Sequence, residues 1–257
     1  MEPILTRDQI VGVVAPGFRV RPALLRRGVA RLESMGFRTL LGDSVTADDG
    51  YLAGDDEARF ADLSGMLSRP DVAAVWFARG GYGTARLLRR LRPAQLRGVR
   101  PALIGYSDLT ALFAQFTRAG SRRCLYGPVV TELGDPASYH AGSLRAALAG
   151  REQILKPKRK QIWCEGRASG TLVGGNLTVL TSLIGTRFRP TLRGRILFLE
   201  DVGEPTYRID RMLTQWRDAG WLRGLAGVLL GSFDVTPRRH FPPDRDPDVV
   251  LREFFDP

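Results

Sequence analysis

Apolar runs and helical periodicity alternate along the first half of the chain. Short aliphatic and β-branched runs are typical of buried strands; they occupy residues 9–16, 37–42, 72–78 and 101–107. Stretches with apolar residues three and four positions apart predict amphipathic helices; they occupy residues 21–36, 55–70, 84–91 and 108–120. Because strands that alternate with helices build a parallel sheet with helices on its faces, this half predicts an α/β domain.

The alternation stops near residue 150, where a polar and basic stretch carries no helical apolar stripe. We therefore predict an N-terminal α/β domain over residues 1–149, a linker over 150–165 and a C-terminal domain over 166–257. The elements expected in the last domain are strands at 195–201 and 227–233, a helix at 207–220 and a helical piece at 249–257.

Composition narrows the class of protein. The 257 residues are 44% hydrophobic and 25% charged, which is ordinary for a globular protein. No apolar run approaches the roughly 20 residues of a membrane span, and the N-terminus lacks the pattern of a signal peptide. Cys124 and Cys164 are too few for a disulfide framework or a zinc site. We expect a cytoplasmic protein without a membrane partner.

The formal net charge of +11 raises the question of a polyanionic partner. Only three of the 38 basic residues are lysine, and the arginines are spread along nearly the whole chain. No alternation of aromatic and basic residues, helix-turn-helix or zinc-knuckle spacing accompanies them. We expect no nucleic-acid partner, whereas a small anionic substrate is compatible with the charge.

The stretch "IGYSDLTAL", residues 104–112, places Ser107 where a predicted strand ends and a predicted helix begins. A serine at such a corner is exposed at the carboxyl edge of the sheet, and the N–H groups of the next residues can hold a developing oxyanion. The pattern is similar to a nucleophile elbow but lacks that motif's second glycine. The alternative interpretation is that Ser107 caps the helix.

Two glycine-containing stretches follow other predicted strands. In "ARGGYGTARLL", residues 78–88, the glycines let backbone amides approach a ligand, and Arg79 can grip a carboxylate. A plain glycine turn with a solvated arginine is the alternative. In "GGNLTVLTSLIGT", residues 174–186, Asn176 is a helix cap or a substrate contact.

Acidic residues gather at the end of the strand predicted over residues 195–201 and just past it, at Glu200, Asp201 and Glu204. A carboxylate there can orient a histidine, as in serine triads. Alternatively, Glu204 and Arg208 form an ordinary ion pair at a helix start.

Seven stretches closely resemble, in their residues and in their order, the motifs of the LD-carboxypeptidases of bacterial murein recycling. These enzymes are also called muramoyltetrapeptide carboxypeptidases. The seven stretches are "YLAGDDEARFADL", "WFARGGYGTARLL", "GYSDLTAL", "YGPVVTEL", "GTLVGGNLTVLTSLIGT", "ILFLEDVGEPTYRIDRML" and "GVLLGSF". The microcin self-immunity hydrolases are a related branch. The resemblance extends from Ile10 to about Phe255.

This resemblance implies a serine carboxypeptidase with a Ser–Glu–His triad. The serine would lie in the N-terminal α/β domain, and the glutamate and histidine in a β-rich C-terminal α/β domain. The protein would be a cytoplasmic homodimer that uses no metal and no cofactor. It would release the terminal D-alanine from a murein tetrapeptide, either free or in a sugar or nucleotide conjugate.

The same resemblance assigns roles to individual residues. Ser107 matches the nucleophile and Glu200, in "LFLED", matches the triad glutamate. The amides of Asp108 and Gly81 would form the oxyanion hole. Three further residues fall in motifs near the family's site and would bind substrate: Arg79, Asn176 and Arg208.

The triad histidine has no match. The family places it in a glycine–histidine motif beyond the "GSF" strand, and no such dipeptide occurs here. His140 and His240 stand at other positions, and the sequence ends at Pro257, about where the next family strand would begin. We therefore expect a truncated C-terminal domain and impaired catalysis. The alternative function is a protein that only binds murein peptides or related acyl-nucleotide conjugates. Tyr126 stands where family members often carry histidine.

Overall fold

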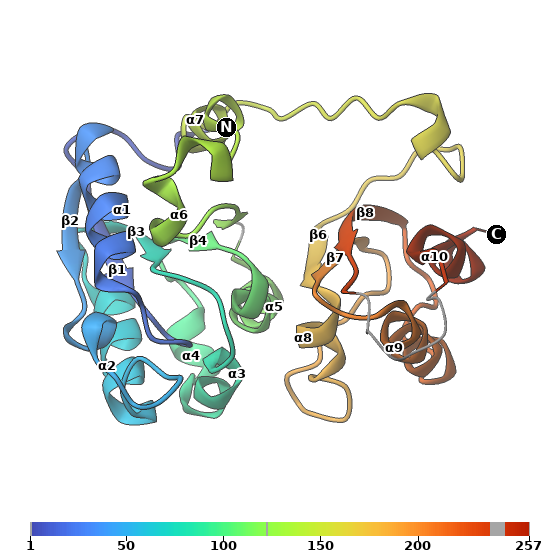
Figure 1. The fold of residues 1–257 in the computed structure, drawn as a ribbon, viewed down its shortest axis with the longest axis horizontal. Helices are drawn as coiled ribbons and strands as arrows, with labels where there is room; N and C mark the ends of the chain where they lie inside the picture. Colours follow the sequence, from blue (N-terminus) through green and yellow to red (C-terminus); the bar gives the residue numbers. More distant parts are fainter. Residues whose placement is uncertain (1, 122, 237–244, 257) are drawn as a thin grey trace. The chain divides into compact units, whose positions relative to one another are not determined.

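The computed structural model describes residues 2–121, 123–236 and 245–256. The chain divides into two compact units, residues 1–154 and 155–257 (Figure 1). The linker expected over residues 150–165 falls at the division between the units, but its bounds remain a prediction.

The first unit contains a five-stranded parallel sheet. Its strands are β1 (Ile10–Val14), β2 (Arg38–Leu41), β3 (Val72–Phe77), β4 (Ala102–Gly105) and β5 (Cys124–Tyr126). They run in the order β2-β1-β3-β4-β5, and every neighbouring pair is parallel. The predicted α/β class is confirmed. Sequence patterns did not predict β5, because three residues give no readable period.

The helices of this unit are α1 (Pro22–Ser34), α2 (Asp56–Ser68), α3 (Thr84–Leu87), α4 (Pro93–Leu96), α5 (Thr110–Arg118), α6 (Val130–Leu133) and α7 (Ala141–Leu148). Proline at the first position of α1 suits a helix start, because its missing N–H would have no partner there. At the start of α2, Asp55 accepts a hydrogen bond of 2.7 Å from the N–H of Ala58.

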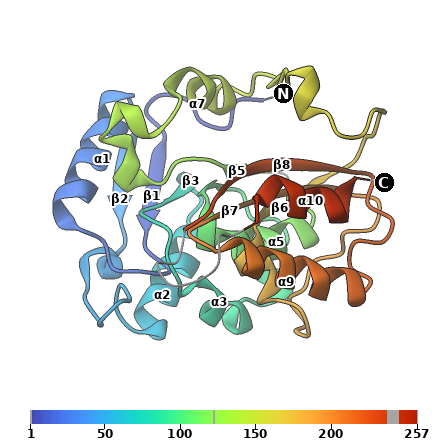
Figure 2. The same ribbon diagram turned by 45° about the vertical axis from the view of Figure 1, so that its right-hand side comes forward.

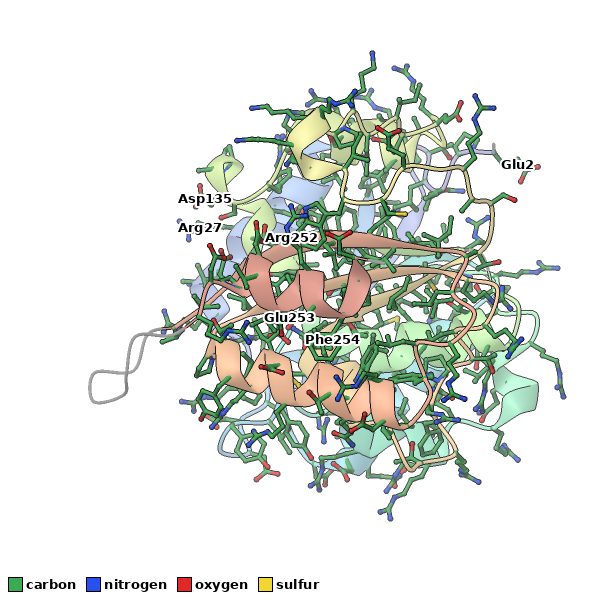
Figure 3. All side chains as sticks on the ribbon, turned by 90° about the vertical axis from the view of Figure 1, so that its right-hand side faces the viewer. Glu2, Arg27, Asp135, Arg252, Glu253 and Phe254 are labelled. Atoms are coloured by element: carbon green, nitrogen blue, oxygen red, sulfur yellow. The ribbon has the colours of Figure 1, made fainter. Side chains whose placement is uncertain are left out.

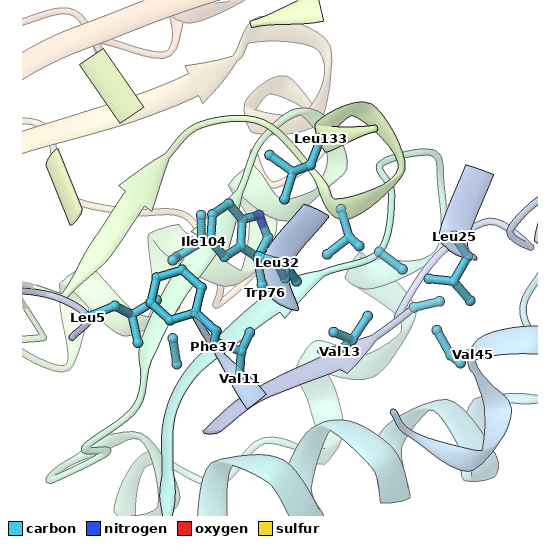
Figure 4. Packing of buried hydrophobic residues seen from close by; sticks show 14 of the residues in the cluster. Leu5, Val11, Val13, Leu25, Leu32, Phe37, Val45, Trp76, Ile104 and Leu133 are labelled. Carbon is cyan, nitrogen blue, oxygen red and sulfur yellow. The ribbon is translucent and has the colours of Figure 1, made fainter. Parts of the chain in front are cut away.

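Helices cover both faces of this sheet because successive strand residues point to opposite sides. On one face, Val11 and Val13 belong to a buried cluster with Leu32 of α1 and with Trp76 of β3 (Figure 4). On the other face, Gly12 lies against α2: a Cβ atom there would be 2.8 Å from the sulfur of Met66. The close approach explains a glycine inside the strand.

The strand order places a topological switch point between β1 and β3. The chain continues from β1 to β2 on one side, and from β3 to β4 on the other. The loops that follow β1 and β3 therefore diverge at the carboxyl edge of the sheet, which is where open α/β sheets bind ligands.

The second unit contains a three-stranded parallel sheet in the order β6-β7-β8. Its elements are β6 (Leu172–Asn176), α8 (Leu177–Thr181), β7 (Ile196–Val202), α9 (Thr206–Asp218), β8 (Gly227–Asp234) and α10 (Pro247–Phe255). The rings of Trp216 and Trp221, both buried, lie 4.2 Å apart between centroids. Gly174 allows β6 to approach β7, since a Cβ atom there would meet the backbone oxygen of Phe198.

The C-terminal helix α10 lies beside α9 (Figure 2). Two arginine–aromatic contacts fasten it, and Figure 3 labels the α10 partner of each. The guanidinium of Arg217 lies 5.5 Å from the ring of Phe254, and that of Arg252 lies 4.1 Å from the ring of Trp163. The predicted C-terminal helical piece is confirmed. Across the described part of the chain, no helix combines the length and apolarity needed to cross a membrane.

Candidate functional site

Ser107 has the backbone conformation of a strained elbow. Its φ is +63°, whereas Tyr106 before it is extended. The left-handed region costs a non-glycine residue about 1–2 kcal/mol. Ser107 is not a helix cap: Tyr106 caps the 3₁₀ turn Ser107–Leu109, and Leu109 caps α5. The capping alternative is therefore wrong, and the corner has the geometry of a nucleophile elbow.

Aromatic side chains support this corner. The backbone N–H of Ser107 donates a 3.0 Å hydrogen bond to the hydroxyl oxygen of Tyr126. The ring of Tyr126 packs edge-on against Tyr106 at 6.1 Å and Phe113 at 6.2 Å. The hydroxyl of Tyr106 in turn donates to the carboxylate of Glu132. The half-buried N–H of the strained residue is thus satisfied by a hydroxyl that neighbouring rings hold in place.

The loop after β3, residues 79–83, lies directly against Ser107, and we call it the glycine loop. A Cβ atom at Gly80 would be 3.1 Å from the Cβ and 3.3 Å from the Oγ of Ser107. Gly81 has φ +95°, and a Cβ atom there would collide with the ring of Phe18. Only glycine lets the loop take this path between Ser107 and Phe18.

Two buried charged side chains anchor this loop. The carboxylate of Asp108, only 5% exposed, accepts a 2.8 Å hydrogen bond from the N–H of Thr84. Burial raises the pKa of Asp108, and the hydrogen bonds from Thr84 and the charge of Arg59 oppose that rise. The buried guanidinium of Arg59 donates to the backbone oxygens of Pro16 and Gly83. The side chains of Arg59 and Asp108 therefore hold the loops after β1 and β3 in place at the switch point.

This arrangement can carry out acyl transfer. A serine oxygen at a strand-to-helix corner is a nucleophile when a base accepts its proton. The N–H of Asp108 belongs to the first turn of the corner, where N–H groups lack acceptors within the helix. Together with an amide of the glycine loop, it can stabilise a tetrahedral oxyanion.

Arg79 lies at the same edge of the sheet. Its guanidinium donates a 2.9 Å hydrogen bond to the backbone oxygen of Arg19 and lies 5.6 Å from the centroid of the Phe18 ring. These contacts fix the side chain beside the glycine loop. Binding of a substrate carboxylate by Arg79 remains a prediction.

In the second unit, Glu200 lies at an irregularity of the sheet. It pairs with Asn176 across β6 and β7, and the register between β7 and β8 shifts between Leu199 and Asp201. Gly231 stands opposite, where a Cβ atom would be 3.1 Å from the Cβ of Glu200. Such an irregularity re-aims a side chain and is frequent beside active sites. The half-buried carboxylate thus stands at a position suited to function.

The neighbouring polar groups have structural roles. The buried carboxylate of Asp201 accepts hydrogen bonds of 2.8 Å from the N–H and the hydroxyl of Thr178. Burial raises its pKa, and these hydrogen bonds oppose that rise. Asn176 caps α8 by accepting a 3.0 Å hydrogen bond from the N–H of Val179, so the capping interpretation is confirmed. Any contact of Asn176 with substrate remains a prediction.

Arg208 forms the ion pair that its spacing indicated. Its guanidinium donates to the carboxylate of Glu204 at 3.2 Å and to the hydroxyl of Tyr207 at 3.3 Å. Glu204 lies just before α9 and Arg208 lies in its first turn, and α9 follows the strand of Glu200. A role of Arg208 toward substrate remains a prediction.

One of the two histidines lies in the described part of the chain. His140 is the N-cap of α7, where its Nδ1 accepts a 3.0 Å hydrogen bond from the N–H of Ser143. His240 lies outside the described residues. The described part of the chain contains no cluster of three or more histidine, cysteine, aspartate or glutamate side chains able to hold a metal ion.

Sequence reasoning missed the contacts by which three residues shape the corner: Gly80, Arg59 and Tyr126. A signal for Arg59 was present, because it shares the buried face of α2 with Leu63 and Met66, four and seven positions on. A charged residue on an apolar helical face marks a buried polar anchor. Gly80 and Tyr126 gave no such signal, since their contacts with Ser107 join separate loops and strands.

Comparison with known proteins identifies the family. Residues 11–127 match the model of the LD-carboxypeptidase N-terminal domain, and residues 169–256 match that of the LD-carboxypeptidase C-terminal domain. The chain therefore belongs to the LD-carboxypeptidase family, which is a family of serine peptidases. It is 38% identical to the murein tetrapeptide carboxypeptidase of Pseudomonas aeruginosa over 90% of this chain and 79% of that protein.

Solved structures have the same fold. The muramoyltetrapeptide carboxypeptidase from Oxalobacter formigenes is 27% identical, with a TM-score of 0.75 over 95% of this chain and 84% of that one. The microcin immunity protein MccF, solved in complex with glutamyl sulfamoyl guanosine, is 23% identical. Its TM-score is 0.83 over 98% of this chain and 85% of that one, a likeness of fold alone.

Proposed function

We propose that this protein is a serine carboxypeptidase that releases the terminal D-alanine from murein tetrapeptides by cutting an L,D bond. The observation that carries the proposal is the strained Ser107, held at the carboxyl edge of the sheet with the glycine loop against its side chain. The name of the Pseudomonas aeruginosa relative supplies the substrate class.

The mechanism we propose begins with attack of the Ser107 oxygen on the carbonyl carbon before the terminal D-alanine. The N–H groups of Asp108 and Gly81 stabilise the oxyanion, and the D-alanine amine leaves with a proton. Water then releases the acyl group from Ser107. Glu200 would orient the histidine that transfers these protons. Neither His140 nor His240 matches the position of that histidine in the family.

Arg79 is our candidate for the substrate carboxylate, because its planar guanidinium stands beside the glycine loop. Asn176 pairs with Glu200 across β6 and β7, and Arg208 lies in α9, the helix that follows the strand of Glu200. We propose that both contact the peptide. Asn176 is held by its hydrogen bond to the start of α8, and Arg208 is held by its ion pair with Glu204. These partners would keep both side chains in place for that contact.

D-alanine release from the free tetrapeptide tests the function. We expect release by the protein and a loss of several powers of ten in Ser107→Ala, with peptide binding retained. Glu200→Gln should lower kcat while leaving the affinity unchanged, and Glu165→Gln, at an exposed position of the same unit, is its control. Release that persists in Ser107→Ala would overturn the assignment of the nucleophile.

The second candidate is a binding protein for murein peptides or acyl-nucleotide conjugates. The solved complex of MccF with glutamyl sulfamoyl guanosine supplies the conjugate class. Tetrapeptide binding without D-alanine release would support it, and binding of neither peptide nor conjugate would exclude both functions.

We also propose that the protein acts in the cytoplasm as a homodimer without metal or cofactor. Light scattering of the purified protein tests the dimer, since a monomer mass at assay concentration would contradict it. Because we propose that no metal is required, we expect D-alanine release to survive the addition of a metal chelator.

A further inference from the structure

A cavity of about 530 Å³ opens at the amino edge of the first sheet. Strands β1, β3, β4 and β5 are neighbours in this sheet, and residues where each of them begins line the cavity. Gln9 precedes β1, Val72 begins β3, Arg100 stands two residues before β4 and Arg123 precedes β5. The volume lies within the range of about 300–1,000 Å³ that is typical of small-molecule sites. We call this space the amino-edge cavity.

The amino-edge cavity is separate from the proposed active site. Ser107 follows β4 at the carboxyl edge of the same sheet, whereas Arg100 lies before that strand. Strands rise about 3.3 Å per residue, so the two ends of the six-residue strand β3 lie roughly 17 Å apart. A ligand in the amino-edge cavity therefore occupies a place of its own, away from the peptide proposed to bind at Ser107.

The guanidinium of Arg123 is only partly satisfied by the protein. Its Nη2 atom donates a 3.2 Å hydrogen bond to the carbonyl oxygen of Ile4. Its Nε atom is buried and has no acceptor within residues 2–121, 123–236 and 245–256, and no carboxylate of those residues pairs with this arginine. Buried donors are nearly always paired, so an orphaned one marks a position at which a negatively charged ligand is favourable.

The remaining charges of the cavity also favour an anion. Arg100 is exposed and has no ion pair with any residue that the structure describes. The carboxylate of Asp71 lines the cavity too, but Arg69 already holds it with two hydrogen bonds of 3.0 and 2.7 Å. That pair leaves the positive charges of Arg100 and Arg123 uncompensated.

We propose that the amino-edge cavity binds the phosphate group of a small phosphomonoester. Such a group carries close to two negative charges at neutral pH, which match the charges of Arg100 and Arg123. The planar fork of a guanidinium fits two phosphate oxygens at once. Val72 and Val99 add apolar lining, which suits the carbon skeleton of the ester. Inorganic phosphate offers the same anionic chemistry without that skeleton.

Calorimetry on the full chain tests the site. The probes are glycerol 3-phosphate, inorganic phosphate and glycerol, at an ionic strength held constant with sodium chloride. We expect glycerol 3-phosphate to bind saturably with a dissociation constant on the order of 1 mM or below, and inorganic phosphate to bind more weakly. Glycerol, which lacks the anion, should not bind.

Four variants locate the binding. Arg100→Gln and Arg123→Gln should each weaken binding of glycerol 3-phosphate at least about tenfold, because each removes a charged donor. Arg26→Gln removes the same charge from an exposed position of α1, and Arg79→Gln removes it from the carboxyl edge; neither should change the affinity. Arg100 is exposed, so Arg100→Gln reports on the site even if loss of the bond from Arg123 to Ile4 destabilises the fold. Circular dichroism establishes that each variant is folded.

Every outcome decides the proposal without a need for turnover. The absence of saturable binding would overturn it, as would full affinity in Arg100→Gln. Loss of binding in Arg79→Gln would place the phosphate at the carboxyl edge and overturn the site. Tighter binding of inorganic phosphate than of the ester would overturn the assignment of an ester. Because none of these measurements uses the murein peptide, they leave the proposed peptidase function to its own test.

Discussion

The backbone conformation of Ser107 sets this residue apart more than its residue type does. Among the described non-glycine residues, positive φ occurs at Asp8 and at Ser107. Asp8 is exposed near the N-terminus, whereas Ser107 follows a fully buried strand. Strain that the surroundings hold in place is typical of functional sites. The hydrogen bond from Ser107 to Tyr126 makes that tyrosine the residue that positions Ser107, the proposed nucleophile.

Replacing Tyr126 tests this role. Tyr126→Phe removes the acceptor of the Ser107 N–H, which costs about 1–3 kcal/mol when the group is buried, so kcat for D-alanine release should fall about tenfold to a hundredfold. KM should change little, because the hydroxyl contacts the corner and not the substrate. Tyr126→His should recover part of kcat, since an imidazole nitrogen can accept the same bond. An equal rise in KM would indicate a binding role instead.

The site depends on how short segments are fastened to one another. The elbow after β4 and the glycine loop after β3 are joined by the hydrogen bond from Thr84 to Asp108. Arg59 of α2 joins the same loop to the one after β1. These links run through buried groups, so a loop that looks flexible in sequence, with three glycines in four residues, is held in one conformation.

Substitution of Asp108 probes this connection through pH. The pKa of Asp108 is raised above its ordinary value of 3.8, so the folded state binds a proton before the unfolded state does. The free energy of unfolding gains a contribution as pH falls through the raised pKa toward 3.8. Asp108→Asn keeps the acceptor for Thr84 and should remove this contribution. Asp108→Ala leaves the N–H without an acceptor and should cost about 1–2 kcal/mol at neutral pH.

Urea unfolding across that pH range measures both variants. The Asn variant should equal or exceed the parent protein in stability at pH 7, because no ionised carboxylate is then buried. A pH dependence in Asp108→Asn identical to that of the parent would show that another group is responsible.

The molecule consists of two units with separate cores. Leu32 lies in the core of the first unit and Leu197 in that of the second, and both are fully buried. The proposed Ser107 and Glu200 belong to different units. Catalysis by the proposed triad therefore requires both units to be folded, although each buries its own apolar residues.

Hydrogen exchange in core variants tests the independence of the units. Leu32→Ala and Leu197→Ala should each cost about 2–5 kcal/mol, because each leaves a cavity in a close-packed core. We expect Leu32→Ala to lower amide protection in residues 1–154 alone and Leu197→Ala to lower it in residues 155–257 alone. Equal loss in both units from either change would mean that the protein unfolds as one body.

The sequence by itself determined the class of the fold and the positions of most elements. The runs that form β1, β3, β4 and β7 are apolar enough to mark strands, and α1, α2 and α9 carry a clear helical stripe. It also placed Ser107 at a corner and Glu200 at a strand end, because both signals are local. The order of its motifs was sufficient to place the chain in its family.

Only the tertiary structure decided what stands beside these residues. The contact of Gly80 with Ser107, the bond from Ser107 to Tyr126 and the burial of Arg59 each join segments from different elements. Whether Ser107 capped a helix or formed an elbow depended on a single φ angle, which propensity does not set. The contact between the rings of Tyr51 and Tyr82 likewise joins two loops. Periodicity describes one segment at a time, whereas such contacts exist only after the sheet has brought the loops to one edge.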